Sequence, residues 1–270
     1  MADPADVSDP PDPAELSEPA GPNDPIETTL LDGRVHCLQP RTGYRIAIDT
    51  VLMAATVPAR PGERLLDVGA GAGAAGLCVA ARVADVDISG IEIQPEFADL
   101  ARRNADINGW AARFQIVNGD VGDPPPVLQP DSFHHVISNP PFVEAGRGRA
   151  PSDPAKAMAK MESHVALAAW IGFCIRMART KATVTIVHRA DRIEEILAAM
   201  AGDVGDLIIF PLWPGGDKPG QPAKRVIVQG RKGMKGPTTL ARGLVLHNPG
   251  GSYTDEANCV LVGAQALEIR

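Results

Sequence analysis

The feature that most constrains this chain is a regular alternation, beginning at Arg64, of short apolar runs with longer helix-like stretches. Apolar runs of about four to eight residues between turn signals predict buried strands. Strands that alternate with helices predict an α/β fold, because right-handed helical crossovers connect parallel strands. We therefore expect a Rossmann-like, doubly wound and mostly parallel sheet of seven strands.

The expected elements are read from these runs and from helix start and stop signals. The predicted strands are Arg64–Val68, Asp87–Ile91, Phe114–Asn118, His134–Ser138, Thr183–Val187, Leu207–Leu212 and Arg225–Gln229. The predicted helices are Ala74–Ala84, Pro95–Asn108, Ser163–Ala178 and Asp191–Ala201, the last with Asp191 and Glu194 in a capping-box pattern. Because open α/β sheets bind ligands beyond the carboxyl ends of their strands, the residues after each strand are the functional candidates.

The N-terminal segment differs in composition from the rest of the chain. Residues 1–28 hold eight acids and neither Lys nor Arg, whereas the remaining chain holds 25 acids and 26 bases. Acidic, proline-rich segments with few large apolar side chains cannot bury enough surface to offset the entropy of ordering. We predict a disordered acidic tail over residues 1–27 and one folded domain over residues 28–270.

Several protein classes are not indicated. The cysteines lie far apart without a CxxC pair, which argues against a zinc knuckle or a disulfide scaffold. No HExxH or GxSxG motif is present, so neither a zinc hydrolase nor a serine hydrolase is supported. No apolar run reaches the roughly 18 residues of a membrane span, and the N-terminus has no signal-peptide pattern. We expect a cytoplasmic protein with reduced thiols, no metal site and no membrane partner.

A glycine-rich turn follows the first predicted strand, with the sequence Asp67-Val68-Gly69-Ala70-Gly71-Ala72-Gly73. Glycine allows positive φ and lets the backbone approach a ligand closely. Backbone N–H groups at the start of the next helix favour an anionic group. With Gly76, the turn fits the GxGxxG pattern of nucleotide-binding folds, although a purely structural turn can have the same composition.

Acidic residues stand at the ends of three neighbouring strands. Asp67 closes the first, Glu92 follows the second at 21 residues beyond Gly71, and Asp120 follows the third. A carboxylate at Glu92 can accept both ribose hydroxyls, and one at Asp120 can accept an adenine amino group. These positions predict a pocket for an adenosine-containing cofactor, either NAD or S-adenosylmethionine. Asp67 favours S-adenosylmethionine, because a carboxylate attracts an amine and a sulfonium but repels a pyrophosphate.

The fourth predicted strand ends in Asn139-Pro140-Pro141-Phe142. Two prolines fix φ and lack N–H groups, so the turn is stiff and rich in carbonyl acceptors. The Asn139 amide oxygen and the Pro140 carbonyl can both accept from one planar NH₂ group, which would free its lone pair to attack a methyl sulfonium. Positioning and acceptor dipoles would carry such a step without a metal, with Phe142 stacked on the flat acceptor.

These motifs, in this order, resemble the class I S-adenosylmethionine-dependent methyltransferases, and more narrowly the amino methyltransferases with an Asn-Pro-Pro-aromatic motif. The segment from Gln39 to Ala54 is similar to the region that precedes the core in the valine-tRNA adenine-N6 methyltransferase family. The resemblance runs from about Thr28 to the C-terminus and includes Lys224-Arg225-Val226-Ile227-Val228. It implies one methyltransferase domain.

The resemblance also implies site residues. The implied cofactor-binding residues are Tyr44, Asp49, Asp67, Gly69, Gly71, Gly73, Glu92, Ile93, Asp120 and Val121. In this set the glycines and Asp67 hold the methionine part with Tyr44 and Asp49 at its border, Glu92 binds the ribose, Ile93 packs on the adenine, and Asp120 reads the adenine edge with the Val121 backbone. The implied acceptor site is Asn139, Pro140, Pro141 and Phe142.

The activity that the resemblance implies is methyl transfer to an exocyclic amine, with adenine N6 in tRNA as the leading acceptor. Phe142 stands where many adenine-N6 and glutamine-N5 enzymes have Tyr, and Phe also occurs in RNA guanine-N2 enzymes, so the acceptor base stays open. The alternative acceptors are guanine N2 in RNA and glutamine N5 of a translation factor. The glutamine enzymes carry a folded N-terminal helical domain, for which the first 27 residues are too short and too polar. Outside this class, an NAD-dependent oxidoreductase and a non-catalytic RNA-binding protein remain open.

Two basic clusters are candidates for contact with RNA. Arg147 and Arg149 follow the Asn-Pro-Pro-Phe motif, and Lys224 and Arg225 begin the last predicted strand. Lys and Arg side chains contact phosphates without reading sequence. Solubilising surface charge is the alternative interpretation. We expect an RNA partner, in the first instance tRNA.

Overall fold

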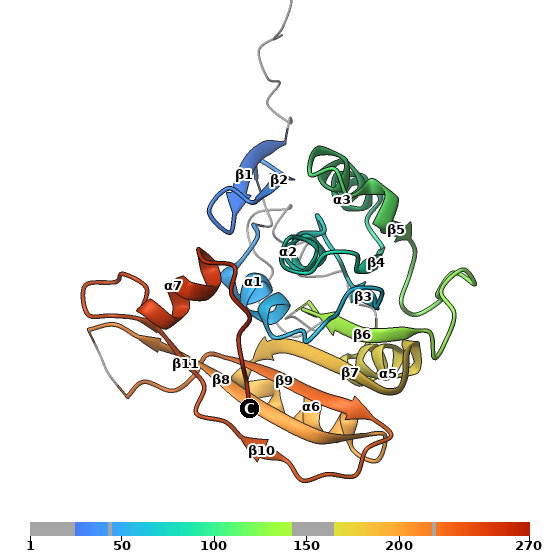
Figure 1. Cartoon of the computed structure of the whole chain (residues 1–270). Coiled ribbons are helices and arrows are strands. Elements are labelled where there is room, and N and C mark those ends of the chain that lie inside the picture. Colours follow the sequence, from blue (N-terminus) through green and yellow to red (C-terminus); the bar gives the residue numbers. More distant parts are fainter. Residues whose placement is uncertain (1–24, 43–44, 142–164, 218–219) are drawn as a thin grey trace, which may run out of the picture.

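The computed structural model describes residues 25–42, 45–141, 165–217 and 220–270 as a nine-stranded sheet with helices on both faces and a separate hairpin (Figure 1). The strands of the sheet are β3 (Arg64–Val68), β4 (Asp87–Glu92), β5 (Phe114–Asn118), β6 (Phe133–Ser138), β7 (Ala178–Arg189), β8 (Val204–Gly215), β9 (Arg225–Lys232), β10 (Thr239–Leu240) and β11 (Leu244–His247). The hairpin is β1 (Ile26–Leu30) and β2 (Val35–Gln39). The helices are α1 (Ile48–Ala55), α2 (Ala74–Arg82), α3 (Pro95–Ile107), α5 (Leu167–Met177), α6 (Ile193–Met200) and α7 (Asp255–Leu261).

The predicted seven-stranded, mostly parallel sheet is confirmed as the centre of a larger one. Its order is β8-β9-β7-β6-β3-β4-β5, and β7, β6, β3, β4 and β5 are parallel. β9 runs antiparallel to both β7 and β8. β10 and β11 pair with successive parts of β8 and widen this edge. These two strands have two and four residues, which is too short for a periodic pattern to reveal.

Alternating side chains of the central strands build two cores. Leu65 and Ile137 point to the face covered by α1, α2, α3 and α7, whereas Leu66 and Val136 point to the face covered by α5 and α6 (Figure 1). This follows from the two-residue period of a strand, which sends neighbouring side chains to opposite faces. Because both faces are covered, buried apolar residues follow one another directly along these strands, as Leu65 and Leu66 do in β3.

Two local predictions are wrong. The proposed capping box fails because Arg192 is the N-cap of α6 without a side-chain bond, and Asp191 instead accepts a 2.9 Å hydrogen bond from Nε of Arg189. The predicted boundary of the tail is also late, because β1 begins at Ile26 and so includes two residues that the sequence assigned to the tail. Residues 1–24 of the predicted tail lie outside the described residues.

The N-terminal hairpin, which the sequence did not reveal, is bound by two side-chain amides of α3. Asn104, fully buried, accepts from the backbone N–H of Leu38 at 2.7 Å and donates to the carbonyl of Leu38 at 3.0 Å. Asn108 makes the same pair of bonds with His36, at 2.9 and 2.7 Å. The two amides lie one helical turn apart and form hydrogen bonds with the β2 backbone, as a neighbouring strand would.

Candidate active site

The candidate site lies at the point in the sheet where the order of strand addition reverses. From β3 the chain adds β4 and β5 on one side and then returns to place β6 on the other side of β3 (Figure 1). The loops after β3 and β6 therefore separate at a topological switch point, where open α/β sheets bind their ligands. The glycine-rich turn follows β3 and Asn139 follows β6, so the structure brings the two predicted motifs together.

The glycine turn has the backbone conformation that its sequence predicts. Gly69, Gly71 and Gly73 have φ of 73°, 55° and 84°, in the left-handed region that favours glycine. The N–H groups of Gly69 and Ala70 both donate to the carbonyl of Ile91, at 2.9 and 3.1 Å, which ties the turn to the end of β4. Gly73 is the N-cap of α2, so the turn leads directly into the start of a helix.

A tryptophan that sequence reasoning missed supports this turn from the opposite face. A Cβ on Gly69 would lie 2.9 Å from the Trp170 ring, so glycine is required by contact as well as by φ. The Trp170 indole N–H donates to the Ser138 hydroxyl at 2.9 Å, and that hydroxyl donates to the Val68 carbonyl at 2.7 Å. The relay fixes the ends of β3 and β6 to each other. The apolar spacing of α5 predicts burial of Trp170 but cannot name its partner.

Asp67 is a buried carboxyl group beneath the turn. It is 3% exposed and accepts a 3.3 Å hydrogen bond from the N–H of Gly76. Burial raises the pKa of Asp67 to about 7, the Gly76 bond lowers it in part, and the charge of Glu92 raises it further. A buried anion of this kind is stabilised by a cationic ligand.

Glu92 is held by backbone donors at the end of β4. Its two carboxylate oxygens accept from the N–H groups of Gly71 at 2.8 Å and Gln94 at 3.0 Å. Asn118, at the end of β5, donates to the Glu92 and Ile93 carbonyls at 2.9 and 3.0 Å. These bonds fix the carboxylate beside the glycine turn, in the position expected for a ribose-binding acid. Ile93, 40% exposed, offers an apolar surface next to it.

The residues predicted to face the adenine lie one strand further along. Asp120 accepts a 2.7 Å hydrogen bond from the N–H of Gly122, which closes a turn after β5. The Val121 side chain is 8% exposed and packs into the core on the α5 side. With Asp67 and Glu92, Asp120 completes the predicted row of carboxylates at the ends of β3, β4 and β5.

Asn139 presents an oxygen with no partner to the same region. Its Nδ2 donates to the Thr50 hydroxyl at 3.3 Å. Its Oδ1 is buried and has no hydrogen-bond partner among the described residues. A small cavity joins Asn139 and Thr50 to Asp67 and Gly69. An acceptor left unpaired in a buried position is costly, and a donor on a ligand relieves that cost.

Asp49 is not among the residues that line this cavity. Its carboxylate accepts a 2.8 Å hydrogen bond from Nε of Arg225 at the start of β9. The α1 residues that line the cavity are Thr50 and Met53. Successive helical residues point about 100° apart, so Thr50 faces the cavity while Asp49 faces Arg225. The same ion pair engages Arg225, which the sequence proposed as a phosphate contact.

The remaining predicted site residues divide by position. Pro140 is buried and Pro141 half-buried directly after Asn139, and Lys224 is exposed. The predictions for Tyr44, Phe142, Arg147 and Arg149 lie outside the described residues. Within the described ranges, no helix is long and apolar enough to cross a membrane, and no group of three or more His, Cys, Asp or Glu could hold a metal ion.

Comparison with known proteins identifies the class. Residues 43–158 match the methyltransferase small domain family. A solved structure of a predicted O-methyltransferase from Agrobacterium tumefaciens is 28% identical, covers 82% of this chain and 98% of its own, and has a TM-score of 0.67. The chain is an S-adenosylmethionine-dependent methyltransferase with the class I fold. Its site fits this cofactor, because a buried anion, a glycine turn and a strand-end glutamate line one edge.

Curated relatives are more specific. The tRNA1(Val) (adenine(37)-N6)-methyltransferase of Aeromonas salmonicida is 26% identical over 82% of this chain and 89% of its own length. That of Cronobacter sakazakii is 32% identical over 44% of this chain and 48% of its own. The structure of the tRNA (m1A58) methyltransferase of Aquifex aeolicus, 17% identical and covering 72% of each chain with a TM-score of 0.52, shares the fold.

Proposed function

We propose that the protein transfers the methyl group of S-adenosylmethionine to N6 of an adenine in tRNA. The observation that carries the proposal is the buried, unpaired Oδ1 of Asn139 beside the glycine turn. Together with the Pro140 carbonyl, an amide oxygen in that position can accept both N–H bonds of an NH₂ group such as adenine N6, whereas a hydroxyl has only one O–H to donate. The curated relatives support tRNA adenine as the substrate.

The residues of the site position the acceptor amine. Asn139 Oδ1 and the Pro140 carbonyl accept its two N–H bonds, and Thr50 accepts from Asn139 Nδ2, which keeps Oδ1 turned toward the acceptor. Two such bonds draw the nitrogen out of conjugation with the ring and make its lone pair available. The rigid Pro-Pro turn holds both acceptors in place at no further entropic cost.

The cofactor side of the site is built from charge and backbone. When bound, S-adenosylmethionine supplies an electrophilic methyl group on a sulfonium. Asp67 would receive the amine of the methionine part, and Glu92 would accept from the ribose hydroxyls. Ile93, Asp120 and Val121 would enclose the adenine. Tyr44 would border the methionine part, as the resemblance implies.

The RNA must present its base outside the stack. Enzymes that modify a base extrude it, and Phe142 would stack on the extruded base. Phosphates next to the base would be contacted by Arg147, Arg149 and Lys224. We also propose that the protein acts in the cytoplasm, where tRNA is found. Lys224 is exposed at the start of β9, and its neighbour Arg225 is paired with Asp49, so we expect Lys224 to contribute more to RNA affinity.

The test uses labelled S-adenosylmethionine and tRNA from cells that lack the protein. The RNA is digested after reaction and its nucleosides are separated by mass. Label in N6-methyladenosine confirms the acceptor and leaves the position to be mapped. Label in N2-methylguanosine retains the chemistry at Asn139 but contradicts the adenine assignment. No labelled nucleoside, with cofactor binding intact, contradicts the RNA substrate and directs the assay to glutamine amides of a translation factor.

A further inference from the structure

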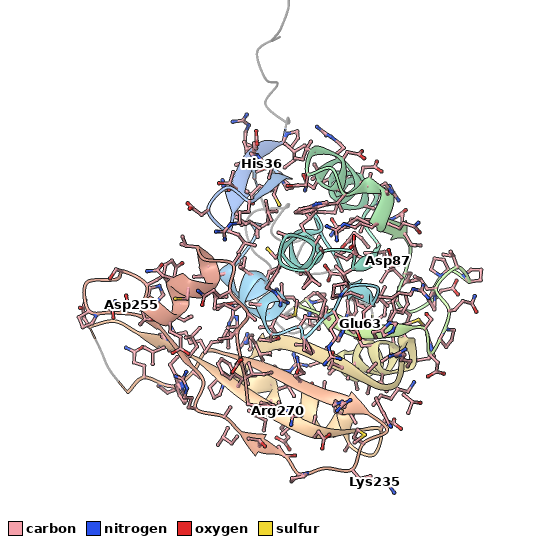
Figure 2. The ribbon with its side chains drawn as sticks, in the orientation of Figure 1. His36, Glu63, Asp87, Lys235, Asp255 and Arg270 are labelled. Carbon is pink, nitrogen blue, oxygen red and sulfur yellow. The ribbon has the colours of Figure 1, made fainter. Side chains whose placement is uncertain are left out.

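A large cavity opens at the amino ends of the parallel strands, away from the candidate active site. Its volume is about 850 Å³. Its walls come from the starts of β3, β6, β7 and β8, the end of β9, the segment after α1 and the last residues of the chain. Figure 2 labels Glu63 and Arg270, which both line it. At about 3.3 Å per residue, β3 alone separates this cavity from the glycine turn by roughly 13 Å.

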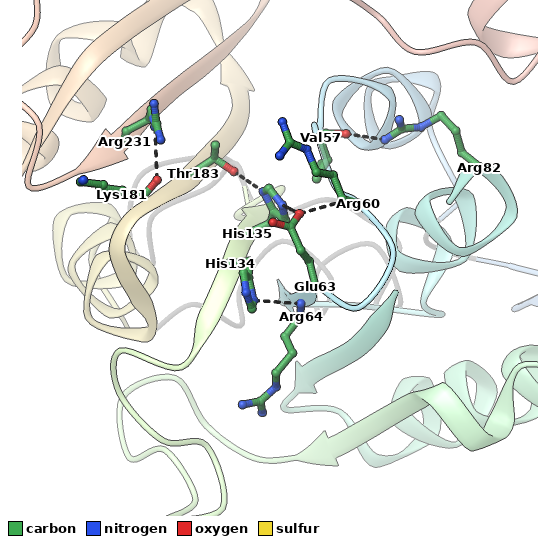
Figure 3. Close-up of polar contacts among 10 residues, drawn as sticks. All are labelled: Val57, Arg60, Glu63, Arg64, Arg82, His134, His135, Lys181, Thr183 and Arg231. Carbon is green, nitrogen blue, oxygen red and sulfur yellow. Dashed lines mark hydrogen bonds and ion pairs between the residues drawn. The ribbon is translucent and has the colours of Figure 1, made fainter. Parts of the chain in front are cut away.

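The floor of the cavity is a closed network of polar side chains. His135, 5% exposed, lies 2.8 Å from Glu63 through Nε2 and 2.7 Å from the Thr183 hydroxyl through Nδ1 (Figure 3). The same carboxylate of Glu63 accepts from the N–H of Arg60 at 2.9 Å. His134 accepts at 3.1 Å from the N–H of Arg64. The buried groups of the floor therefore satisfy one another and leave no demand for a ligand there.

The rim of the cavity is different, because its cations have no carboxylate partners. Six cationic side chains line the cavity: Arg60, Arg82, Arg179, Lys181, Arg231 and Arg270. None of them forms an ion pair within the described part of the chain, and Arg82 donates to the Ala54 and Val57 carbonyls at 3.0 and 2.6 Å. Nε of Arg231 donates to the Lys181 carbonyl at 3.2 Å, which orients its guanidinium (Figure 3). Three carboxylates also line the cavity: Glu63, Asp206 and Glu268. Glu63 is engaged with His135, so cationic charge dominates the rim.

The backbone of β7 is shaped to present two of these cations. Between Phe133 and His135 the pairing of β6 advances two residues, whereas its partner β7 advances five, from Ala178 to Thr183. Such a bulge re-aims side chains and is frequent next to functional sites. Lys181 within it has φ of 67°, a conformation that non-glycine residues adopt at a cost.

Arg179 acts on the floor of the cavity through its charge. Burial lowers the pKa of both His134 and His135, and the nearby Arg179 lowers the pKa of each further. Opposing contributions come from Glu63 on both imidazoles, and Arg64 adds to the lowering at His134. An anion beside Arg179 would offset its field at both rings.

We propose that this cavity binds a small phosphate-bearing anion. Guanidinium groups hold phosphate oxygens through paired, charge-assisted hydrogen bonds, and a concave site of this size encloses a small molecule. The cavity is separated from Asn139 by the length of the strands, so the site is distinct from the acceptor pocket. A small anion fits this site, because the cations line a hollow.

Calorimetry with inorganic pyrophosphate tests the proposal on the full chain. The double variant Arg60→Gln/Arg179→Gln should bind at least about tenfold more weakly than the wild type, because two charge-assisted contacts are lost. Arg103→Gln removes an exposed, unpaired arginine of α3 and should change affinity by less than about twofold. Neither arginine of the double variant donates a side-chain hydrogen bond to another described residue, so unchanged melting is expected. Equal affinity in the double variant would overturn the proposal.

A spectroscopic readout separates this site from other anion contacts. Pyrophosphate should raise the NMR titration midpoints of His134 and His135 in the wild type and not in the double variant. No binding at millimolar pyrophosphate, or binding without a change in those midpoints, would contradict the assignment. Displacement of bound pyrophosphate by tRNA would also contradict it, because the cavity would then belong to the RNA-binding surface. The binding of S-adenosylhomocysteine should be the same in all variants.

Discussion

The two ends of the parallel strands differ in which polar groups they leave without partners. At the carboxyl ends, buried groups are left in unfavourable surroundings: Oδ1 of Asn139 has no hydrogen-bond partner among the described residues, and burial raises the pKa of the Asp67 carboxyl to about 7. At the amino ends, the buried groups Glu63, His135 and Thr183 satisfy one another. The carboxyl edge therefore stores an energetic cost that a ligand can relieve, whereas the amino edge contributes to stability.

The largest expected effect is at Asn139. Asn139→Ala should lower methyl transfer by at least about 10³-fold, because the acceptor amine loses a preorganised partner. Binding of S-adenosylhomocysteine, measured by calorimetry, should change less than about threefold. Thr50→Val serves as the matched control, because it removes the hydroxyl that holds the Asn139 amide and leaves the amide itself in place. An Asn139→Ala enzyme with full activity would contradict the role of the carboxyl edge in chemistry.

Asp67→Asn should weaken cofactor binding by about 100-fold, since an amide cannot offset the cofactor's charge. In the wild type, affinity should fall as pH drops from 8 to 6, because the carboxyl with a pKa of about 7 must ionise to receive an amine. The variant should lose this dependence. Calorimetry at several pH values checks it, and a pH-dependent wild type with an equally pH-dependent variant would contradict the assignment.

The same substitution should stabilise the cofactor-free protein. The folded-state pKa of Asp67 lies above its unfolded value, so the folded state binds more protons between about pH 4 and 7 and stability falls as pH rises. At pH 8, Asp67→Asn should raise the free energy of unfolding by on the order of 1–2 kcal/mol. Urea denaturation measures this value. A loss of stability at pH 8 would show that the bond from Gly76 stabilises the ionised carboxylate by more than its burial costs.

Trp170→Phe should have a smaller effect on turnover. Phenylalanine keeps the contact with Gly69 but lacks the N–H that reaches Ser138, which costs about 1 kcal/mol of stability. The freed ends of β3 and β6 should lower kcat by about five- to tenfold with little change in cofactor affinity. Steady-state kinetics and melting of the variant separate the two contributions. A change in KM alone would contradict a positioning role.

At the amino edge, His135→Gln should alter stability and not activity. Burial lowers the pKa of His135, with Glu63 opposing it, so the folded state resists protonation and wild-type stability falls as pH drops below 6.5. Burial alone would raise the pKa of Glu63, but the bonds from His135 and Arg60 hold it below its usual value. Protonation of Glu63 at lower pH therefore causes a further loss of stability. The variant should lose about 1–2 kcal/mol at pH 8 and show a flatter dependence between pH 5 and 7. A drop in methyl transfer at constant stability would contradict the expectation that the amino ends of the strands serve stability and the carboxyl ends serve activity.

The smallest effects are expected at the start of β9. Lys224→Gln should weaken tRNA binding by about two- to threefold and reduce the salt dependence by about one phosphate contact. Arg225→Gln should instead cost about 0.5–1 kcal/mol of stability, because its partly exposed ion pair with Asp49 is lost. Filter binding at several salt concentrations distinguishes the two residues. Equal effects on RNA would contradict the distinction.

The sequence predicted the central strands because they are apolar on both faces, and it located the glycine turn and Asn139 because both directly follow strands. It did not predict the N-terminal hairpin, whose β2 is paired by Asn104 and Asn108 from a distant helix. Nor did it give the partner of Trp170. Such contacts depend on which distant segments meet, and no local pattern carries that information. Asp191 shows the converse. It stands in a capping-box pattern, but its carboxylate accepts a hydrogen bond from Arg189 and does not cap α6.

Asn104 joins two segments between which no backbone hydrogen bond forms in the described part of the chain. Besides its bonds to Leu38, its Nδ2 donates to the Ala72 carbonyl in the glycine turn at 2.9 Å. A ligand that rigidifies the turn must also reduce the local opening of the hairpin, because one side chain anchors both. The backbone amide of Leu38 should therefore exchange its hydrogen more slowly when the cofactor is present. The hairpin thus becomes a distant reporter of occupancy at a site that it does not touch.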